Sequence, residues 1–202
     1  MDVKRNIYSQ FRQPHGPLGH VAGWIMARRR SNIERNLWTL DLLDLQPGQN
    51  VLEVGHGPGI ALRYLLQQHA DLRATGIDHS ATMHRHAARR NRSDLAAGRL
   101  ELLVGTVERC HGSLGTFDRI FSTNVAQFWE DATATLATLR TLLTPGGMIA
   151  TTYMPRHAGA TGADTDAFAD RLVGQATSAG FVDVRPVFRD FDGLRTVCVL
   201  AS

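Results

Sequence analysis

A glycine-rich segment, Val51-Leu52-Glu53-Val54-Gly55-His56-Gly57-Pro58-Gly59, is the part of this sequence with the clearest chemical meaning. A short apolar run leads into it, and a run typical of a helix follows. Glycines allow a positive φ and let a ligand approach the backbone closely, while a helix N-terminus offers unpaired N–H groups. The last glycine comes one residue too early for the dinucleotide-binding fingerprint. The segment predicts a cofactor-binding turn; a tight turn without a ligand is the alternative.

A carboxylate, Asp78, ends the next apolar run, Thr75-Gly76-Ile77-Asp78. An ionised carboxylate only accepts hydrogen bonds, so it is suited to the two hydroxyl groups of a ribose. The first two strands of a doubly wound sheet are neighbours, and ligands bind at the carboxyl ends of such strands. We therefore expect Asp78 beside the glycine turn. An acid that only stabilises a helix N-terminus is the alternative, and NAD enzymes use the same position.

Alternating strand-like and helical runs would hold these residues in place. Strands are expected over residues 50–54, 72–77, 100–104, 117–122 and 148–153, with a final hairpin over 182–188 and 195–200. Helices are expected over residues 21–43, 60–69, 80–97, 132–143 and 164–179. The apolar stripe of the first helix comprises Trp24, Ile25, Ile33, Leu37, Leu40 and Leu43. This alternation predicts an α/β fold with a mostly parallel sheet and helices on both faces.

Over residues 45–202 the chain resembles the class I S-adenosylmethionine-dependent methyltransferases. The resemblance rests on the glycine turn with Glu53, on Asp78, and on the segments 117–124, 143–147 and 179–181. It implies a doubly wound, seven-stranded, mostly parallel sheet whose last strand is antiparallel, in a Rossmann-like methyltransferase fold. It also implies S-adenosylmethionine as the cofactor and S-adenosylhomocysteine as the product. We expect residues 1–202 to form a single domain, with residues 1–43 as an arm and helix that act as a lid.

The resemblance assigns roles around the glycine turn. Gly55, His56 and Gly57 would line the methionine part of the cofactor. Glu53 would orient the turn or meet the amino group, and Asp78 would hold the ribose. The expected cofactor-binding residues are Glu53, Gly55, His56, Gly57, Gly59, Asp78, His79, Met83, Thr106, Val107, Glu108, Asn124 and Val125.

The adenine side departs from the family pattern. Many relatives carry Gly-Asp-Ala after the third strand, where this chain has Gly105-Thr106-Val107. Thr106 or Glu108 would have to replace the missing aspartate. His79 and Met83 would flank the adenine, and Asn124 and Val125 would back the methionine part.

The sequence does not reveal a catalytic residue. Transfer of a methyl group from a sulfonium is an in-line displacement, to which alignment of the reactants alone contributes roughly 7–11 kcal/mol. Such an enzyme works without a fixed triad. Residues expected to face the substrate are His15, His20, Gln127, Trp129 and Tyr153. For the histidines, a surface or packing role is the alternative.

Composition limits the partners and the setting. The chain has 202 residues, of which 43% are hydrophobic, and a net charge of +3, as in an ordinary single-domain protein. It has no apolar run long enough to cross a membrane and no secretory signal near its start, so we expect a cytoplasmic protein without a membrane partner. His84 and His86 are two apart on a predicted helix and face different directions, so we expect no metal site. The N-terminal helix is of a type that docks on a partner, which allows a homodimer.

Three other functions stay open. A nucleic-acid methyltransferase of the same fold is suggested by the basic run over residues 85–92, although a solvated helix face is the explanation we prefer for it. An NAD(P)-dependent oxidoreductase is disfavoured by the turn spacing and by the absence of a Tyr-x-x-x-Lys pair, since Lys4 is the only lysine. A non-catalytic cofactor-binding relative is the third. A small-molecule acceptor is the interpretation we prefer.

Overall fold

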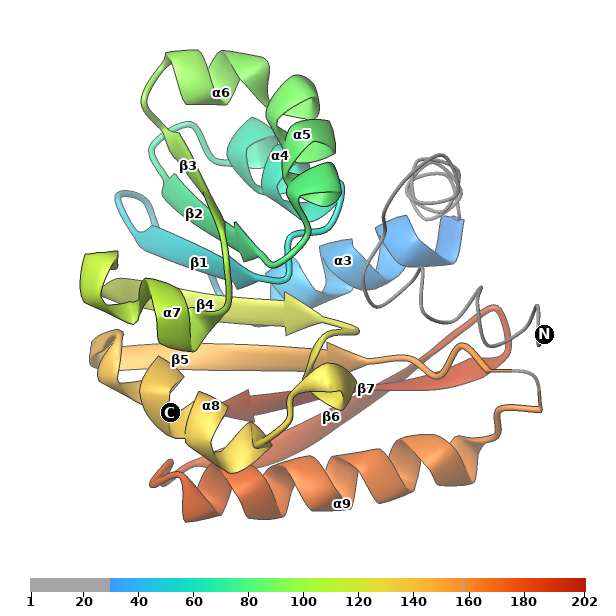
Figure 1. Cartoon of the computed structure of the whole chain (residues 1–202). Helices are drawn as coiled ribbons and strands as arrows, with labels where there is room; N and C mark the ends of the chain where they lie inside the picture. Colours follow the sequence, from blue (N-terminus) through green and yellow to red (C-terminus); the bar gives the residue numbers. More distant parts are fainter. Residues whose placement is uncertain (1–29, 158) are drawn as a thin grey trace, which may run out of the picture.

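The computed structural model describes residues 30–157 and 159–202 (Figure 1). Its strands are β1 (Asn50–Val54), β2 (Arg73–Asp78), β3 (Leu100–Val104), β4 (Phe117–Thr123), β5 (Leu143–Tyr153), β6 (Val184–Phe191) and β7 (Leu194–Ala201). Its α-helices are α3 (Arg30–Leu42), α4 (Ile60–Gln68), α5 (Ala81–Arg90), α6 (Arg92–Ala96), α7 (Val107–Cys110), α8 (Ala132–Thr141) and α9 (Gly162–Ser178). Two short 3₁₀ turns, η1 (His111–Ser113) and η2 (Ala126–Phe128), follow α7 and β4.

The strands form one sheet in the order β3-β2-β1-β4-β5-β7-β6. The first five run parallel to one another, and β7 runs antiparallel to both β5 and β6. Leu52 of β1 pairs with Thr75 of β2 on one side and with Ile120 of β4 on the other. The predicted doubly wound sheet is confirmed, and the carboxyl ends of β2, β1 and β4 lie side by side.

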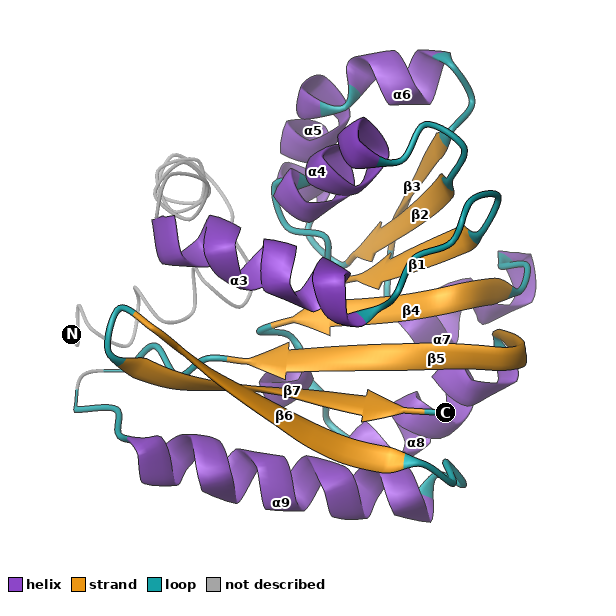
Figure 2. Cartoon of the chain, turned by 180° about the vertical axis from the view of Figure 1, so that it is seen from behind, coloured by secondary structure: helices purple, strands orange, loops and turns teal. Residues whose placement is uncertain are grey.

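Helices cover both faces of the sheet (Figure 2). One apolar core lies between the sheet and α7, α8 and α9, and a second lies beneath α3 and α4. Successive strand residues enter opposite cores: Ile120 belongs to the first and Phe121 to the second. Strands buried on both faces appear as continuous apolar runs, which is why the sequence shows the central strands clearly.

The helix expected over residues 80–97 is in fact two helices. They meet at Asn91, whose φ of −109° and ψ of 25° are not helical. The Asn91 side-chain amide donates to the Ala87 carbonyl oxygen at 2.9 Å and to the Gly59 carbonyl oxygen at 3.0 Å. The break thus ties α5 to the glycine turn. At the other end of α5, Ser80 is the N-cap, and its hydroxyl accepts from the Met83 N–H.

The fifth strand begins earlier than the expected residue 148. It starts at Leu143 and includes the segment 145–147, whose Pro-Gly-Gly sequence is typical of a turn. Here the pairing of β5 with β4 shifts register between Phe117 and Arg119, and Gly146 has a φ of +76°. A local irregularity lets a Pro-Gly-Gly segment sit inside a strand without a regular ladder.

Helix α3 presents a different face to the sheet from the one its apolar residues predict. Ile33 and Leu37 are only half-buried. The residues buried at spacings of three and four are instead Asn32, Arg35, Asn36 and Thr39. The Thr39 hydroxyl lies 2.7 Å from the Thr152 hydroxyl of β5. The expected stripe is therefore wrong for the middle of this helix, and a polar stripe takes its place.

The direction of α3 carries that stripe to the carboxyl ends of the strands. Arg119, near the start of β4, donates to the Leu43 carbonyl oxygen at 2.7 Å, which fixes the C-terminal end of the helix at the amino ends of the strands. Figure 2 shows α3 crossing the sheet and extending past the tips of β1 and β4. Its first turns therefore overhang the edge where the glycine turn lies.

Some expectations lie outside the described residues. These are the arm over residues 1–20 with His15 and His20, and the first part of the expected helix with Trp24 and Ile25. Among the residues that are described, no helix is long and apolar enough to cross a membrane.

Candidate functional site

The glycine turn joins β1 to α4 and is anchored on β2. The N–H groups of Gly55 and His56 donate to the Ile77 carbonyl oxygen at 2.7 and 3.2 Å. Gly55 has a φ of +75°, and a Cβ at this position would lie 2.4 Å from a Val125 methyl carbon. A side chain would meet both backbone strain and a collision. Gly55 is thus required by the contact between the turn and the segment after β4.

Asp78 lies beside this turn, as its place in the sequence predicts. One carboxylate oxygen accepts from the Gly57 N–H at 2.8 Å, and the other accepts from the Ser80 N–H at 2.8 Å. Asp78 is buried, with 7% of its surface exposed. Because a carboxylate oxygen accepts more than one hydrogen bond, both oxygens keep capacity for a ligand.

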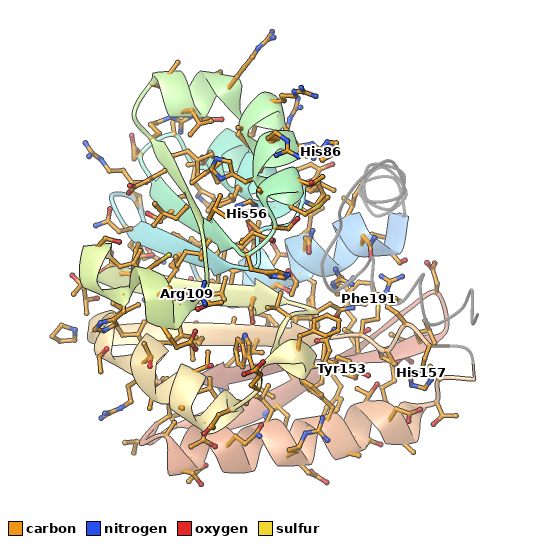
Figure 3. All side chains as sticks on the ribbon, in the orientation of Figure 1. His56, His86, Arg109, Tyr153, His157 and Phe191 are labelled. Atoms are coloured by element: carbon orange, nitrogen blue, oxygen red, sulfur yellow. The ribbon has the colours of Figure 1, made fainter. Side chains whose placement is uncertain are left out.

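Glu53 and His56 are buried around the turn with polar atoms left unpaired. The Oε2 atom of Glu53 and the Nε2 atom of His56 are both enclosed without a hydrogen-bond partner, whereas His56 Nδ1 lies 2.8 Å from the Gly57 carbonyl oxygen. Burial and the nearby charge of Asp78 raise the pKa of Glu53 well above its ordinary value. Burial lowers the pKa of His56. Both shifts favour the neutral form of the side chain. His56 is labelled in Figure 3.

The adenine side is built from the ends of β2 and β3. The Gly105 N–H donates to the Asp78 carbonyl oxygen at 3.0 Å, which brings the two strand ends together. Met83 and Val107 are buried beside this junction, while His79 is exposed. Thr106 is the exposed residue that precedes α7.

Glu108, expected at the adenine, is engaged elsewhere. Its Oε1 atom accepts from the Thr135 hydroxyl of α8 at 2.7 Å. Although partial burial raises the pKa of Glu108, hydrogen bonds from the Thr135 hydroxyl, the local backbone and the Thr106 side chain bring it below the ordinary value. This carboxylate serves the contact between α7 and α8 and also engages the Thr106 side chain, so neither residue has an uncommitted side chain for the role of the missing aspartate.

The side chain of Asn124 is also used within the protein. Its φ is +55°. Its amide donates to the Met154 carbonyl oxygen at 2.9 Å and accepts from the Met154 N–H at 2.8 Å, joining the ends of β4 and β5. These two bonds leave one amide N–H and one oxygen lone pair of Asn124 for a ligand, besides its backbone. Val125 fills the space over Gly55, as described above.

The residues expected at the substrate differ in their surroundings. Gln127 donates to the Asn124 carbonyl oxygen at 2.9 Å, while its own Oε1 atom is buried without a partner. Trp129 packs against the apolar core. The Tyr153 ring, labelled in Figure 3, stacks on Phe168 of α9 with ring centroids 4.0 Å apart. Gln127 is thus the described member of this set with a buried polar atom still unused.

Arg35, which sequence reasoning missed, belongs to the same edge of the sheet. It is buried, with 7% of its surface exposed, and its Nε atom has no hydrogen-bond partner. Desolvation, with the nearby positive charge of Arg156 as the second cause, lowers the pKa of Arg35 to about 9. No sequence signal marked Arg35, because the polar spacing Asn32, Arg35, Asn36 and Thr39 is typical of a helical face that lies in solvent.

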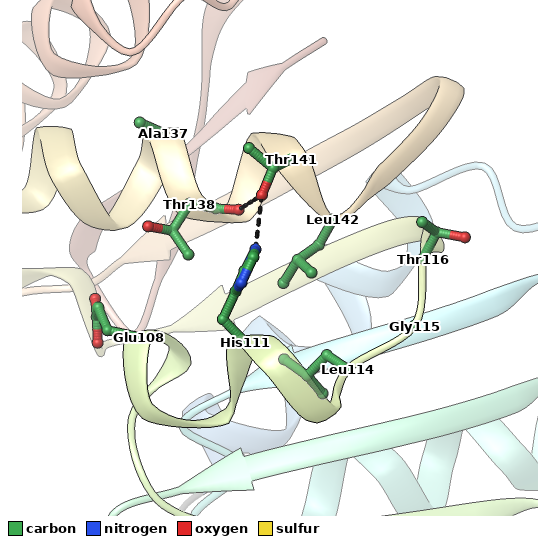
Figure 4. A pocket seen from close by; sticks show the side chains of 9 residues that line it. All are labelled: Glu108, His111, Leu114, Gly115, Thr116, Ala137, Thr138, Thr141 and Leu142. Carbon is green, nitrogen blue, oxygen red and sulfur yellow. Dashed lines mark hydrogen bonds between the residues drawn. The ribbon is translucent and has the colours of Figure 1, made fainter.

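A separate hollow lies near the opposite edge of the sheet. A groove of about 920 Å³ runs between α8 and the α7–η1 segment, lined by residues that include His111, Leu114, Thr138 and Thr141 (Figure 4). The His111 Nε2 atom lies 3.0 Å from the Thr141 hydroxyl across it. Leu142 and Gly115 place this groove near the amino end of β4. It is open and lacks the buried unpaired atoms found around the glycine turn, so the carboxyl edge is the better candidate site. Within the described chain, no group of three or more His, Cys, Asp or Glu side chains is arranged to hold a metal ion.

Comparison with known proteins identifies the family. Residues 51–147 match the family described as a methyltransferase domain. The chain is 32% identical to YdaC of Bacillus subtilis (strain 168), named an uncharacterized methyltransferase, over 182 residues that cover 90% of this chain and 97% of YdaC. The chain belongs to the class I S-adenosylmethionine-dependent methyltransferases. The family's cofactor is therefore S-adenosylmethionine.

Solved structures share the fold of this methyltransferase. A proposed sarcosine dimethylglycine methyltransferase from Galdieria sulphuraria superposes with a TM-score of 0.66 at 15% identity, covering 84% of this chain and 85% of that one. A phosphoethanolamine N-methyltransferase from Haemonchus contortus, solved with phosphomonomethylethanolamine and S-adenosylhomocysteine, gives a TM-score of 0.64 at 16% identity. That match covers 83% of this chain and 52% of that one. At these identities the likeness establishes the fold alone.

Proposed function

We propose that this methyltransferase binds S-adenosylmethionine at the carboxyl ends of β1, β2 and β4 and transfers its methyl group to a small molecule. The observation that carries the proposal is the bond between Asp78 and the Gly57 N–H. It places an acceptor-only carboxylate beside a glycine turn at the point where ligands bind in doubly wound sheets.

The residues at this edge suit the parts of the cofactor. Asp78 would accept from the ribose hydroxyls, and Met83 and Val107 offer apolar surface for the adenine. A Cβ built on Gly57 meets nothing within 4 Å, which leaves room for a ligand against the backbone. The unpaired Glu53 and His56 atoms at the turn would gain partners from the polar groups of the methionine part.

The chain's task in catalysis is positioning. When bound, the cofactor supplies a methyl group activated by its sulfonium. The residues after β4 and β5 would hold the acceptor with its nucleophile in line with that methyl group and exclude water. Gln127 is the described candidate for an acceptor contact, because its buried Oε1 atom is free to accept a hydrogen bond. A small acceptor suits a chain of 202 residues, most of which form the core of the fold.

Calorimetric titration with S-adenosylmethionine and S-adenosylhomocysteine tests the cofactor assignment. We expect micromolar binding of both, weakened by Asp78→Ala by about 1–3 kcal/mol, because a hydrogen bond to a charged group is lost. Asp190→Ala, on the edge strand β6, is the matched control and should bind as the wild type does. Since the Gly57 bond is lost too, the fold of Asp78→Ala must be checked by circular dichroism.

Failure to bind either compound, with NAD(P) tested in parallel, would refute the proposal. Binding without methylation of any member of a panel of small acceptors would instead favour the non-catalytic relative.

A further inference from the structure

We propose that Arg35, Asn32 and Arg156 form a binding site for an anionic oxygen group, a carboxylate or phosphate, carried by the methyl acceptor. The location in the acceptor's pocket rests on the proposed function; the anion site itself does not. The argument comes from the polar stripe of α3 and from what faces it.

The first observation is a buried cation without a counter-charge. No carboxylate of the described residues lies within ion-pair distance of Arg35, and its Nε atom is enclosed and unpaired. Its only described hydrogen bond from the guanidinium is a long one, from Nη1 to the Asn32 Oδ1 atom at 3.4 Å. Buried charges are normally paired or hydrogen-bonded throughout. A guanidinium in this state presents donors in a geometry that matches a carboxylate or phosphate.

The second observation is a second cation at the same place. Arg156, in the segment after β5, donates to the same Asn32 Oδ1 atom and lies 3.5 Å from the Met154 sulfur. One amide oxygen is therefore shared by two guanidinium groups whose charges repel each other. An arriving anion would relieve this repulsion and give Arg35 a counter-charge and a hydrogen-bond acceptor for its Nε atom.

Glu53 is the carboxyl group whose charge acts on Arg35, but the two form no ion pair. Burial together with Asp78 raises the pKa of Glu53, against the opposing effect of Arg35, so that the charged form of Glu53 is disfavoured. Its Oε2 atom is itself unpaired. Glu53 and Arg35 thus face the same region without satisfying each other.

The position of the cluster assigns it to the acceptor. Asp78 and the glycine turn lie at β2 and β1, whereas Arg156 follows β5, beyond β4 in the sheet order. Thr39 and Thr152 fix α3 over the end of β5. With the nucleoside at β1 and β2, the acceptor must lie on the β4 and β5 side, under the first turns of α3.

Thermal unfolding with a probe anion tests the site without any cofactor. Wild-type protein would be titrated with sodium phosphate and with sodium acetate, at ionic strength held constant with sodium chloride. We expect saturable stabilisation that needs at least tenfold more anion in Arg35→Met and Arg156→Met. Arg185→Met, an exposed arginine on β6, should match the wild type. No stabilisation of the wild type beyond that of chloride, or an equal effect in all variants, would overturn the proposal.

Arg35→Met removes a buried group and could prevent folding. Arg156→Met and Arg35→Lys are therefore included as variants that we expect to fold. If Arg35→Met does not fold, the result from Arg156→Met decides. Arg35→Lys keeps the positive charge but lacks the planar guanidinium that binds an anion through two N–H groups. We expect this variant to keep part of the stabilisation by phosphate and acetate.

A second titration identifies the source of the anion. We expect S-adenosylhomocysteine to bind Arg35→Met within threefold of its wild-type affinity and not to compete with phosphate. If Arg35→Met weakens S-adenosylhomocysteine at least tenfold while 5′-methylthioadenosine, which lacks the amino-acid part, binds unchanged, the anion is the cofactor's carboxylate and the acceptor assignment is wrong. If the wild type binds no S-adenosylhomocysteine at all, the proposed function fails, while the phosphate titration still decides the anion site.

Discussion

At the residue scale, Gly55 and Gly57 share a left-handed backbone but differ in surroundings. An alanine at either adopts an unfavourable φ, which costs roughly 1–2 kcal/mol. At Gly55 the new methyl group would also lie 2.4 Å from a Val125 methyl carbon, whereas at Gly57 it would meet open space. We expect Gly55→Ala to lower the free energy of unfolding by about 2–5 kcal/mol, strain and overpacking together. Gly57→Ala should lower it by only about 1–2 kcal/mol. Urea unfolding measures both.

A double variant separates the two causes. Val125→Ala in the Gly55→Ala background should recover the part of the lost free energy of unfolding that is due to the collision. The part due to backbone strain should remain. Equal destabilisation by the two glycine substitutions would show that the contact with Val125 is unimportant.

Glu53 makes stability depend on pH. Burial and Asp78 raise its pKa in the folded protein above the unfolded value, so the folded state holds a proton that the unfolded chain releases above about pH 4.5. This contribution is fully present below the unfolded pKa and is lost as the pH rises toward the folded pKa. We expect Glu53→Gln, which cannot ionise, to gain stability relative to the wild type with rising pH, by up to about 1.4 kcal/mol per pH unit.

Urea unfolding of both proteins between pH 5 and 8 gives the difference curve. His56 acts in the opposite direction, because its lowered pKa removes stability as the pH falls below about 6.5. Because His56 is present in both proteins, its contribution cancels to first order in the difference between their free energies of unfolding. A difference that is constant with pH would mean that Glu53 is ionised in the folded state.

The residues at the site differ in how far sequence reasoning reaches them. The position of Asp78 could be predicted from the sequence, because topology alone puts the ends of β1 and β2 together. The position of Arg35 could not be predicted, since an arginine in a helix normally lies in solvent and its burial depends on how α3 crosses the sheet. Glu108 shows the same limit: Thr135, its partner, is distant in sequence and sits on another helix.

At the element scale, Asn124 joins β4 to β5 and so shapes the edge on which the acceptor would lie. Substitution can separate the contribution of its two hydrogen bonds to the Met154 backbone from the contribution of its φ of +55°. Asn124→Gly keeps the backbone conformation and loses the bonds, which should cost about 1–3 kcal/mol. Asn124→Ala loses the bonds and adds strain, so we expect a further loss of about 1–2 kcal/mol.

Chemical unfolding of both variants checks the order. If Asn124→Gly were as stable as the wild type, the side-chain bonds would have no net value, and the position would be explained by its backbone alone. Amide exchange at Met154, whose N–H is donated to Asn124, should accelerate in both variants.

Among the elements, those with strong apolar periodicity were predictable and their internal irregularities were not. Central strands stand out because both faces are buried. The break at Asn91 was missed because an asparagine is tolerated in a helix, and only its bond to Gly59, from a separate segment, makes the break useful. The early start of β5 was missed because Pro-Gly-Gly signals a turn, whereas its pairing with β4 is a long-range contact.

At the scale of the whole molecule, the sheet order decides where a ligand binds. Strand β1 has β2 on one side and β4 on the other. From β1 the chain first builds β2 and β3 on one side of the sheet and then β4 and β5 on the other. Such a switch opens a crevice at the carboxyl ends. The groove beside α8 lies near the amino end of β4, despite its size of about 920 Å³. The fold therefore separates this groove from the site with unpaired buried groups.

Hydrogen exchange with and without S-adenosylhomocysteine tests this separation over the whole chain. We expect slower exchange in residues 54–60, 78–84 and 105–107, because bound ligand suppresses local opening of the segments it contacts. Residues 111–116 and 137–142, which border the groove, should exchange unchanged. Ala137→Trp, which places a large side chain in that groove from an exposed position, should bind S-adenosylhomocysteine within threefold of the wild type. Protection of the groove segments together with loss of binding in Ala137→Trp would move the cofactor to the amino-end groove. The pairing of Asp78 with Gly57 would then be a purely structural device that fixes the turn.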